Sequence, residues 1–155
     1  MKLARVDETL TNLEIAHRQL ERAIDLFMGP KDYVSALTLA GAAEEILGKL
    51  LNKRGQTHWL DEITSGALGA LGFVDAEADS PEAKAARKEI ANLANFYKNR
   101  CKHFSEVDQI SFPVDVKAAE MIDRAVSNYW DLTNRETGAM GRFREVVLRY
   151  GGHGE

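Results

Sequence analysis

Apolar residues recur every three or four positions through most of the chain, the spacing that places them on one face of an α-helix. This pattern predicts long helices over residues 6–27, 32–54, 81–103 and 114–135, and shorter ones over 58–72 and 140–150. Alternation of apolar and polar residues, which is typical of strands, does not extend over a useful length. Long amphipathic helices joined by short connections predict an all-α fold, an antiparallel helical bundle.

Turn and cap residues lie between the predicted helices. Asp7 or Thr9 is expected to cap the first helix, and Gly55 to end the second. Ser80, directly before Pro81, is a good start for the third long helix, because serine caps and proline suits the first turn. Residues 1–150 are therefore expected to form a single helical bundle domain, and 151–155 a disordered tail.

The second long helix carries two adjacent apolar stripes, which indicates that it lies at the centre of the bundle. Gly41 and Gly48 fall on one edge of it, where each glycine costs about 1 kcal/mol against alanine. Close approach of a neighbouring helix would compensate. Glu44 lies at the edge of the apolar arc, so this half-buried carboxylate needs a partner. Either it orients Lys98 or His103, or it forms an ordinary structural ion pair.

Composition and charge narrow the classes of function. The chain has 155 residues, a formal net charge of −4 and one cysteine, Cys101, which excludes an internal disulfide. The acidic balance argues against a general nucleic-acid coat but permits a local basic patch. The first residues lack the apolar run of a signal peptide, and the chain lacks a stretch long enough to span a bilayer. We expect a cytoplasmic protein without membrane contact.

A local excess of positive charge lies between residues 83 and 103, where Glu89 is the one acidic residue. Such a strip attracts phosphate groups, although cations also suit a solvated helix face near the C-terminal end of a helix. The six cationic residues are Lys84, Arg87, Lys88, Lys98, Arg100 and Lys102.

The same predicted helix places Asn92, Asn95, Asn99 and His103 on one face. Amides both donate and accept hydrogen bonds, and histidine titrates near neutral pH, so this face could bind a ligand or do acid–base chemistry. The alternative is a solvated polar face with an exposed histidine.

Two segments, SALTLAGAAEEILGKLL (35–51) and ANLANFYKNRCKHFSE (91–106), together resemble the HEPN superfamily (higher eukaryotes and prokaryotes nucleotide-binding). These domains are small helical bundles, many of them dimers. Many are metal-independent RNases of toxin–antitoxin, phage-abortive or CRISPR systems, and others are inactive or bind nucleotides. The family motif joins an arginine, followed by a polar residue, to a histidine a few positions on. Asn99 and His103 match it, whereas Lys98 stands where the family has arginine.

The resemblance implies roles for these residues in a homodimer whose clefts meet at its interface and contact RNA or a nucleotide. His103 would be the acid and base, Lys98 with Lys102 the phosphate cation, and Asn99 the positioning residue. Arg100, Asn95 and Glu44 would support binding. The resemblance also allows an antitoxin or nucleotidyltransferase partner protein and implies no cofactor.

Two other interpretations stay open. One is a non-enzymatic helical dimer that binds a partner protein. The other is a di-metal bundle built on Glu14 and His17, which form a Glu-x-x-His pair on the first helix. Such bundles need a second pair, which this sequence does not contain. We therefore expect no metal site.

Overall fold

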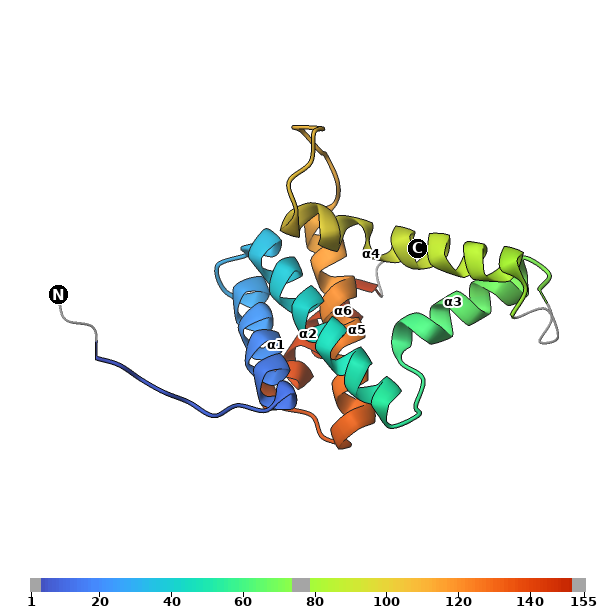
Figure 1. The fold of residues 1–155 in the computed structure, drawn as a ribbon. Helices are drawn as coiled ribbons and strands as arrows, with labels where there is room; N and C mark the ends of the chain where they lie inside the picture. Colours follow the sequence, from blue (N-terminus) through green and yellow to red (C-terminus); the bar gives the residue numbers. More distant parts are fainter. Residues whose placement is uncertain (1–3, 74–78, 152–155) are drawn as a thin grey trace.

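The computed structural model describes residues 4–73 and 79–151 and confirms the all-α prediction: these ranges hold six helices and no strand (Figure 1). No helix in the described part of the chain is both long and apolar enough to cross a membrane. Residues 152–155, most of the predicted tail, lie outside the described ranges. The helices are α1 (Asn12–Met28), α2 (Tyr33–Lys53), α3 (Trp59–Ala70), α4 (Pro81–Lys102), α5 (Val114–Thr133) and α6 (Gly138–Gly151).

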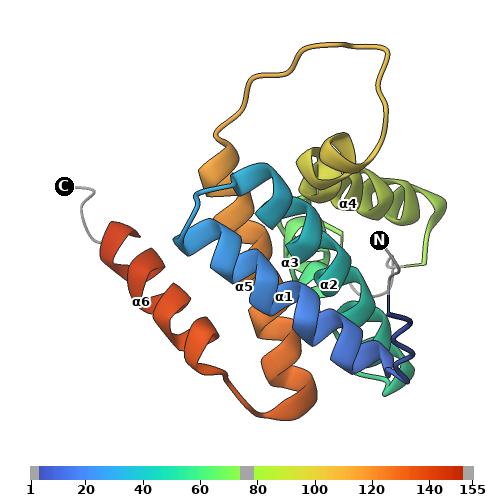
Figure 2. The same cartoon turned by 90° about the vertical axis from the view of Figure 1, so that its left-hand side faces the viewer.

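The core forms where α2 packs between α1 and α5, with α6 lying beside α1 and α5 (Figure 2). Its side chains come from the apolar stripes of these four helices, which close on each other and exclude water. The largest fully buried apolar side chains are Leu20, Ile24, Leu37, Leu47, Leu51, Ile122, Met140 and Phe143.

The two central helices, α2 and α5, run in the same direction. Glu44 in the middle of α2 contacts Arg124 of α5, and Arg54 at the end of α2 donates to the carbonyl of Leu132, one residue from the end of α5. The prediction of a wholly antiparallel bundle is wrong for this pair. The prediction assumed that short connections join consecutive long helices, whereas α3, α4 and a long loop separate α2 from α5.

Helices α3 and α4 pack on each other and project from the core as an arm (Figure 1). Only the C-terminal half of α4 reaches α2, so the apolar face predicted for α4 is buried only in part. Leu93 and Phe104, apolar residues of α4 and of the loop after it, are 69% and 89% exposed. A helix on an arm packs on a narrow stripe, and the remainder of its apolar face stays uncovered.

The first helix begins later than its periodicity predicts. Thr11, and not Asp7 or Thr9, is the cap, because its hydroxyl oxygen accepts from Glu14 while the Glu14 carboxylate accepts from the Thr11 backbone. This reciprocal capping box sets the residue at which the helix begins. The other predicted helix boundaries differ from the observed ones by at most two residues. Ser80 caps α4 as predicted, and Gly55 adopts a φ of 69° beyond α2.

Candidate functional site

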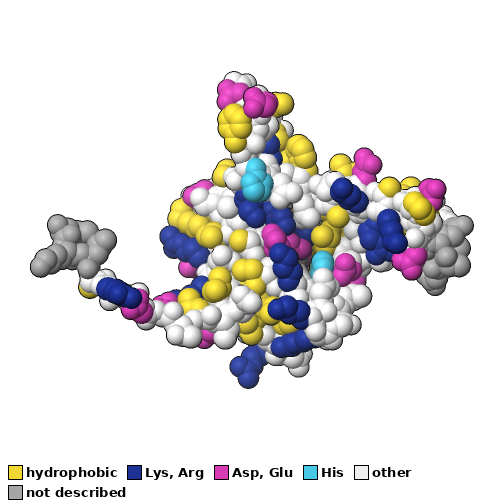
Figure 3. Space-filling view, viewed as in Figure 1, with side chains coloured by type: hydrophobic (Ala, Val, Ile, Leu, Met, Phe, Trp, Pro, Cys, Tyr) yellow, Lys and Arg dark blue, Asp and Glu magenta, His cyan; other side chains and the backbone are white. Residues whose placement is uncertain are grey.

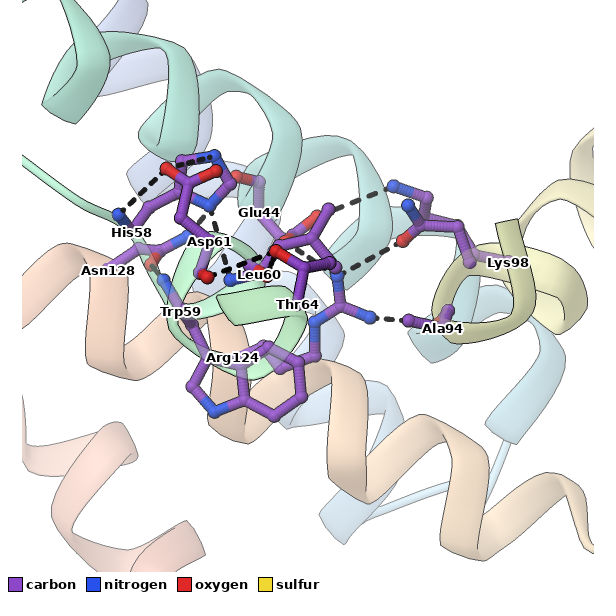
Figure 4. A network of polar contacts seen from close by, with 11 residues as sticks. Glu44, His58, Trp59, Leu60, Asp61, Thr64, Ala94, Lys98, Arg124 and Asn128 are labelled. Carbon is purple, nitrogen blue, oxygen red and sulfur yellow. Dashed lines mark hydrogen bonds and ion pairs between the residues drawn. The ribbon is translucent and has the colours of Figure 1, made fainter. Parts of the chain in front are cut away.

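A buried ionic cluster lies where α2, α4 and α5 meet (Figure 4). The Glu44 carboxylate accepts from Arg124 Nη2 at 2.8 Å and from Lys98 Nζ at 3.4 Å. All three side chains are withdrawn from solvent, with exposures of 3%, 3% and 5% for Glu44, Arg124 and Lys98. One carboxylate therefore holds two cations, and the cluster carries one formal positive charge in excess.

Glycines on α2 allow its neighbours to come this close. A Cβ added to Gly41 would overlap Cγ and Cδ of Lys98, and one added to Gly48 would lie 3.4 Å from the imidazole of His58. As the glycine pattern predicts, neighbouring elements approach α2 along this edge. His58, a side chain with only 12% exposure, also caps α3 by accepting from the backbone of Leu60.

Arg124 and Asn128 extend the cluster and join four helices. Arg124 donates to the Ala94 carbonyl and to Asn95 Oδ1, both at 3.0 Å, and its guanidinium lies 4.6 Å from the centre of the Trp59 ring. Asn128 accepts from the backbone of Trp59 at 3.1 Å and donates to the Glu44 carbonyl at 3.4 Å. These hydrogen bonds between buried polar groups hold α2, α3, α4 and α5 in one arrangement.

Sequence reasoning did not select Arg124, Asn128 or Trp59. A signal for two of them was present, because Arg124 and Asn128 lie one turn apart on the buried stripe of α5, beside Ala125 and Tyr129. A polar pair inside an apolar stripe indicates that a buried partner exists. It does not indicate which residue that partner is.

Lys98 does not share a cleft with Asn99 and His103, which corrects the arrangement inferred from the motif. Its ammonium turns inward to Glu44, whereas Asn99 and His103 are exposed on the outer side of α4. Each residue turns a helix by about 100°, so neighbours in sequence face different sides. Glu44 meets Lys98, the first of its two predicted partners, and Asn95 turns to Arg124 and not to the outer face.

An outer groove of about 290 Å³ forms at the C-terminal end of α4. His103 ends the helix in an extended conformation, and its N–H donates to the Asn99 carbonyl at 3.0 Å. Arg100 donates to the Val107 carbonyl and so holds the following loop beside the helix. The groove is lined by Asn92, Phe96, Asn99, Arg100, His103, Phe104 and Ser105.

A basic row continues from this end of α4 onto α2. Lys102 Nζ lies 3.8 Å from Glu45, which also accepts from Lys49 at 2.9 Å, and Lys53 follows one turn later. The hydrogen bond from Lys49 lowers the pKa of Glu45, and the charges of Lys98 and Lys102 lower it further. Figure 3 shows Lys and Arg side chains in a row over α2 on this face.

The other cations predicted on the strip lie elsewhere. Lys84, Arg87 and Lys88 line a separate hollow of about 290 Å³ between α3 and α4, with His58 and Asp61 on its other side. The strip is therefore divided between two places on the arm.

Large apolar side chains are exposed on α4 and on the loop that follows it. We call this the α4–loop surface, and it borders the outer groove, with which it shares two phenylalanines. Large contiguous apolar patches on protein surfaces are typical of interaction sites. Its residues are Leu93, Phe96, Phe104, Val107 and Ile110.

Glu14 and His17 have separate structural roles. Glu14 completes the capping box of α1, while the His17 ring stacks on Tyr129 with centroids 5.4 Å apart. Among the described residues, no group of three or more His, Cys, Asp or Glu side chains is placed to hold a metal ion. Burial raises the pKa of the Cys101 thiol above its ordinary value of 9.0, so this thiol stays protonated near neutral pH.

Comparison of the chain with protein-family models, with curated proteins and with solved structures gives no match.

Proposed function

We propose that this chain is a HEPN-like helical domain that contacts single-stranded RNA through the outer groove. The observation that carries the proposal is the composition of that groove. It places two exposed phenylalanine rings beside an arginine, a histidine and two amides. Aromatic rings stack on bases, worth about 1–3 kcal/mol per base, and arginine binds phosphate. Amides can read the edges of unpaired bases.

The basic row supports the same proposal. In a chain of net charge −4, Lys102, Lys49 and Lys53 gather on one face that adjoins the groove. A track of cations beside a stacking platform is the arrangement that binds single strands with little sequence preference. A strand whose bases stack on Phe96 and Phe104 would extend its phosphates over α2.

RNA cleavage, if the domain performs it, would depend on His103. The attacking 2′-hydroxyl must lose a proton and the leaving oxygen must gain one, and an exposed histidine can carry either. Lys98 is buried on Glu44, so Arg100 and Lys102 are the cations left to meet the phosphate. A second copy would supply a second His103, which gives both an acid and a base.

Pairing of two copies is part of this proposal. Leu93, Phe104 and Val107 are more than half exposed, and Phe104 also lines the groove, so a second copy that covers this surface would bring two grooves together. The alternative function is a non-enzymatic interaction module. In that case the α4–loop surface binds a partner protein, such as an antitoxin or a nucleotidyltransferase, and the groove is part of a protein interface.

Fluorescence anisotropy with a labelled mixed-sequence single-stranded RNA tests the proposal, with cleavage followed in EDTA. We expect Phe104→Ser to weaken binding about tenfold, because one stacking contact is lost. Trp130→Ser is the matched control, since this exposed ring lies on α5 outside the groove, and it should bind as wild type does. Loss of cleavage in His103→Ala with binding retained would assign the chemistry to His103.

The remaining outcomes separate the two functions. No RNA binding by the wild-type protein at low salt would reject the RNA proposal. Sedimentation analysis of wild type and Leu93→Asp then decides between copies and partners: a wild-type dimer that the variant splits supports self-pairing. A wild-type monomer would contradict self-pairing and favour binding of a different protein at the α4–loop surface.

A further inference from the structure

A second cavity, of about 400 Å³, opens between α4 and α5 on the side of α4 that does not face the outer groove. Its volume is within the range of small-molecule sites in proteins. Six apolar side chains form one part of its wall, and the charged part combines the two buried cations, Lys98 and Arg124, with three further charged residues. Its lining residues are Leu37, Trp59, Leu93, Ala94, Tyr97, Lys98, Lys117, Glu120, Met121, Asp123 and Arg124.

Arg124 has hydrogen-bonding capacity that the protein does not use. Its Nη1 donates to Ala94 and its Nη2 to Glu44 and Asn95, but its Nε is buried and has no hydrogen-bond partner among the described residues. A buried donor left without a partner costs about 1–3 kcal/mol. Such a group in a folded protein indicates a water molecule, an ion or a ligand as its partner.

The charge around the cavity indicates the sign of the charge that a ligand would carry. Glu44 balances only one of Lys98 and Arg124, so the buried cluster has one positive charge in excess. At the mouth, Lys117 and Glu120 pair with each other at 2.8 Å. A single negative charge on a ligand would neutralise the cluster.

The acid Asp123 does not supply that charge. Asp123 also lines the neighbouring hollow between α5 and α6, together with Arg144. The positive charge of Arg144 acts on the Asp123 carboxylate. Burial raises the pKa of Asp123 above its ordinary value, while the charge of Arg144 acts in the opposite direction.

The walls favour a flat apolar body. The Trp59 ring covers one face of the Arg124 guanidinium at 4.6 Å, and the Tyr97 ring is held in place by stacking on Phe112 with centroids 4.6 Å apart. Both rings line the cavity, together with Leu37 of α2 and Met121 of α5. Their orientation is fixed by neighbours, so the space between them is formed before a ligand arrives.

We infer that this cavity binds a small aromatic monocarboxylate. Its carboxylate accepts from Arg124 Nε and Lys98 Nζ, and its ring packs on Trp59, Tyr97 and Met121. The excess of one charge favours a monoanion over a phosphate ester, which carries close to two charges at neutral pH. This site is independent of the RNA groove, because Ala94 and Tyr97 point to the opposite side of α4 from Asn92 and Asn99.

Isothermal titration with naphthalene-2-carboxylate tests the inference, with naphthalene-2-carboxamide as the neutral counterpart and naphthyl phosphate as the dianion. We expect the carboxylate to bind with a dissociation constant below about 1 mM and at least about tenfold more tightly than the amide. Equal binding of acid and amide would overturn anion recognition, and tighter binding of the phosphate would overturn the charge assignment. No heat at about 10 mM carboxylate would overturn the site itself.

Two variants and one spectrum locate the binding. Ala94→Phe fills the cavity from α4 and should abolish binding, whereas Ala85→Phe, an exposed position on the same helix outside the cavity, should leave it unchanged. The Nε–H resonance of Arg124, assigned by its loss in Arg124→Lys, should shift on titration of the wild-type protein with the carboxylate. Binding that survives in Ala94→Phe, or that leaves this resonance in place, contradicts the inference.

Discussion

The aliphatic stem of Lys98 occupies the space that a side chain at position 41 would fill. A Cβ on Gly41 would overlap Cγ and Cδ of Lys98, and the ammonium at the end of the same stem reaches Glu44 one turn later on α2. Helix α4 is thus held to α2 by a steric fit and an ionic contact through one side chain. Both contacts lie at the only part of α4 that reaches the core.

Gly41→Ala should destabilise the protein although alanine is the better helix former. The added methyl displaces Lys98, which is enclosed and cannot move without opening the contact with Glu44. Overpacking of this kind costs about 1–3 kcal/mol. Urea denaturation followed by circular dichroism measures the free energy of unfolding.

Gly66→Ala is the matched control for that substitution. Gly66 is an exposed helical glycine with no atom within 4 Å of an added Cβ. Relief of the glycine penalty should stabilise the control variant by about 1 kcal/mol. If Gly41→Ala proved as stable as Gly66→Ala, the close approach of Lys98 to α2 would not exist in solution.

The buried cluster predicts unequal losses of stability when its carboxylate and its lysine are replaced. Glu44→Gln leaves Lys98 and Arg124 buried without a counter-charge, so the free energy of unfolding should fall by about 3–5 kcal/mol. Lys98→Met keeps the stem on Gly41 and leaves Glu44 paired with Arg124, so its loss should be about 1 kcal/mol. Thermal and chemical denaturation compare both with Glu45→Gln, an exposed carboxylate. Equal losses for Glu44→Gln and Lys98→Met would contradict the assigned network.

The proposed RNA contact predicts a specific salt dependence. Each cation that meets a phosphate of a single strand contributes about 0.7 to the slope of log affinity against log salt concentration. Lys53→Gln should therefore reduce the slope by about 0.7, while Arg149→Gln on α6 should not change it. An unchanged slope in Lys53→Gln would remove α2 from the proposed track.

The capping box of α1 predicts a dependence of stability on acid pH. The backbone N–H and the hydroxyl of Thr11 donate to the Glu14 carboxylate and lower its pKa below the ordinary value of 4.5. A lowered folded-state pKa stabilises the fold above pH 4.5, and this contribution is lost as pH falls through the folded-state pKa.

Glu14→Gln keeps the shape of the side chain and removes its charge. It should be less stable than wild type at pH 7, and the difference should shrink below pH 4.5. In a Thr11→Val background, where one donor is missing, the same substitution should show a weaker pH dependence. A difference that does not vary with pH in either background would refute the role of the Glu14 charge.

Local patterns in the sequence were sufficient for the helices. The periodicity of apolar residues, the Ser80 cap and the glycine after α2 all act within a few neighbouring residues, so the helices and most of their ends could be predicted. The glycine edge of α2 and the position of Glu44 also indicated that a helix with a partner would approach there. These are properties of one helix at a time.

Only the tertiary structure decided which faces meet. The parallel course of α2 and α5, the projection of α4 on an arm and the burial of Lys98 in place of Asn99 depend on contacts between distant segments. Arg124 lies 80 residues from Glu44, and the sequence around either residue does not predict their contact. Because each residue turns a helix by about 100°, a small rotation of a docked helix changes which side chain faces the core. That rotation depends on contacts throughout the fold.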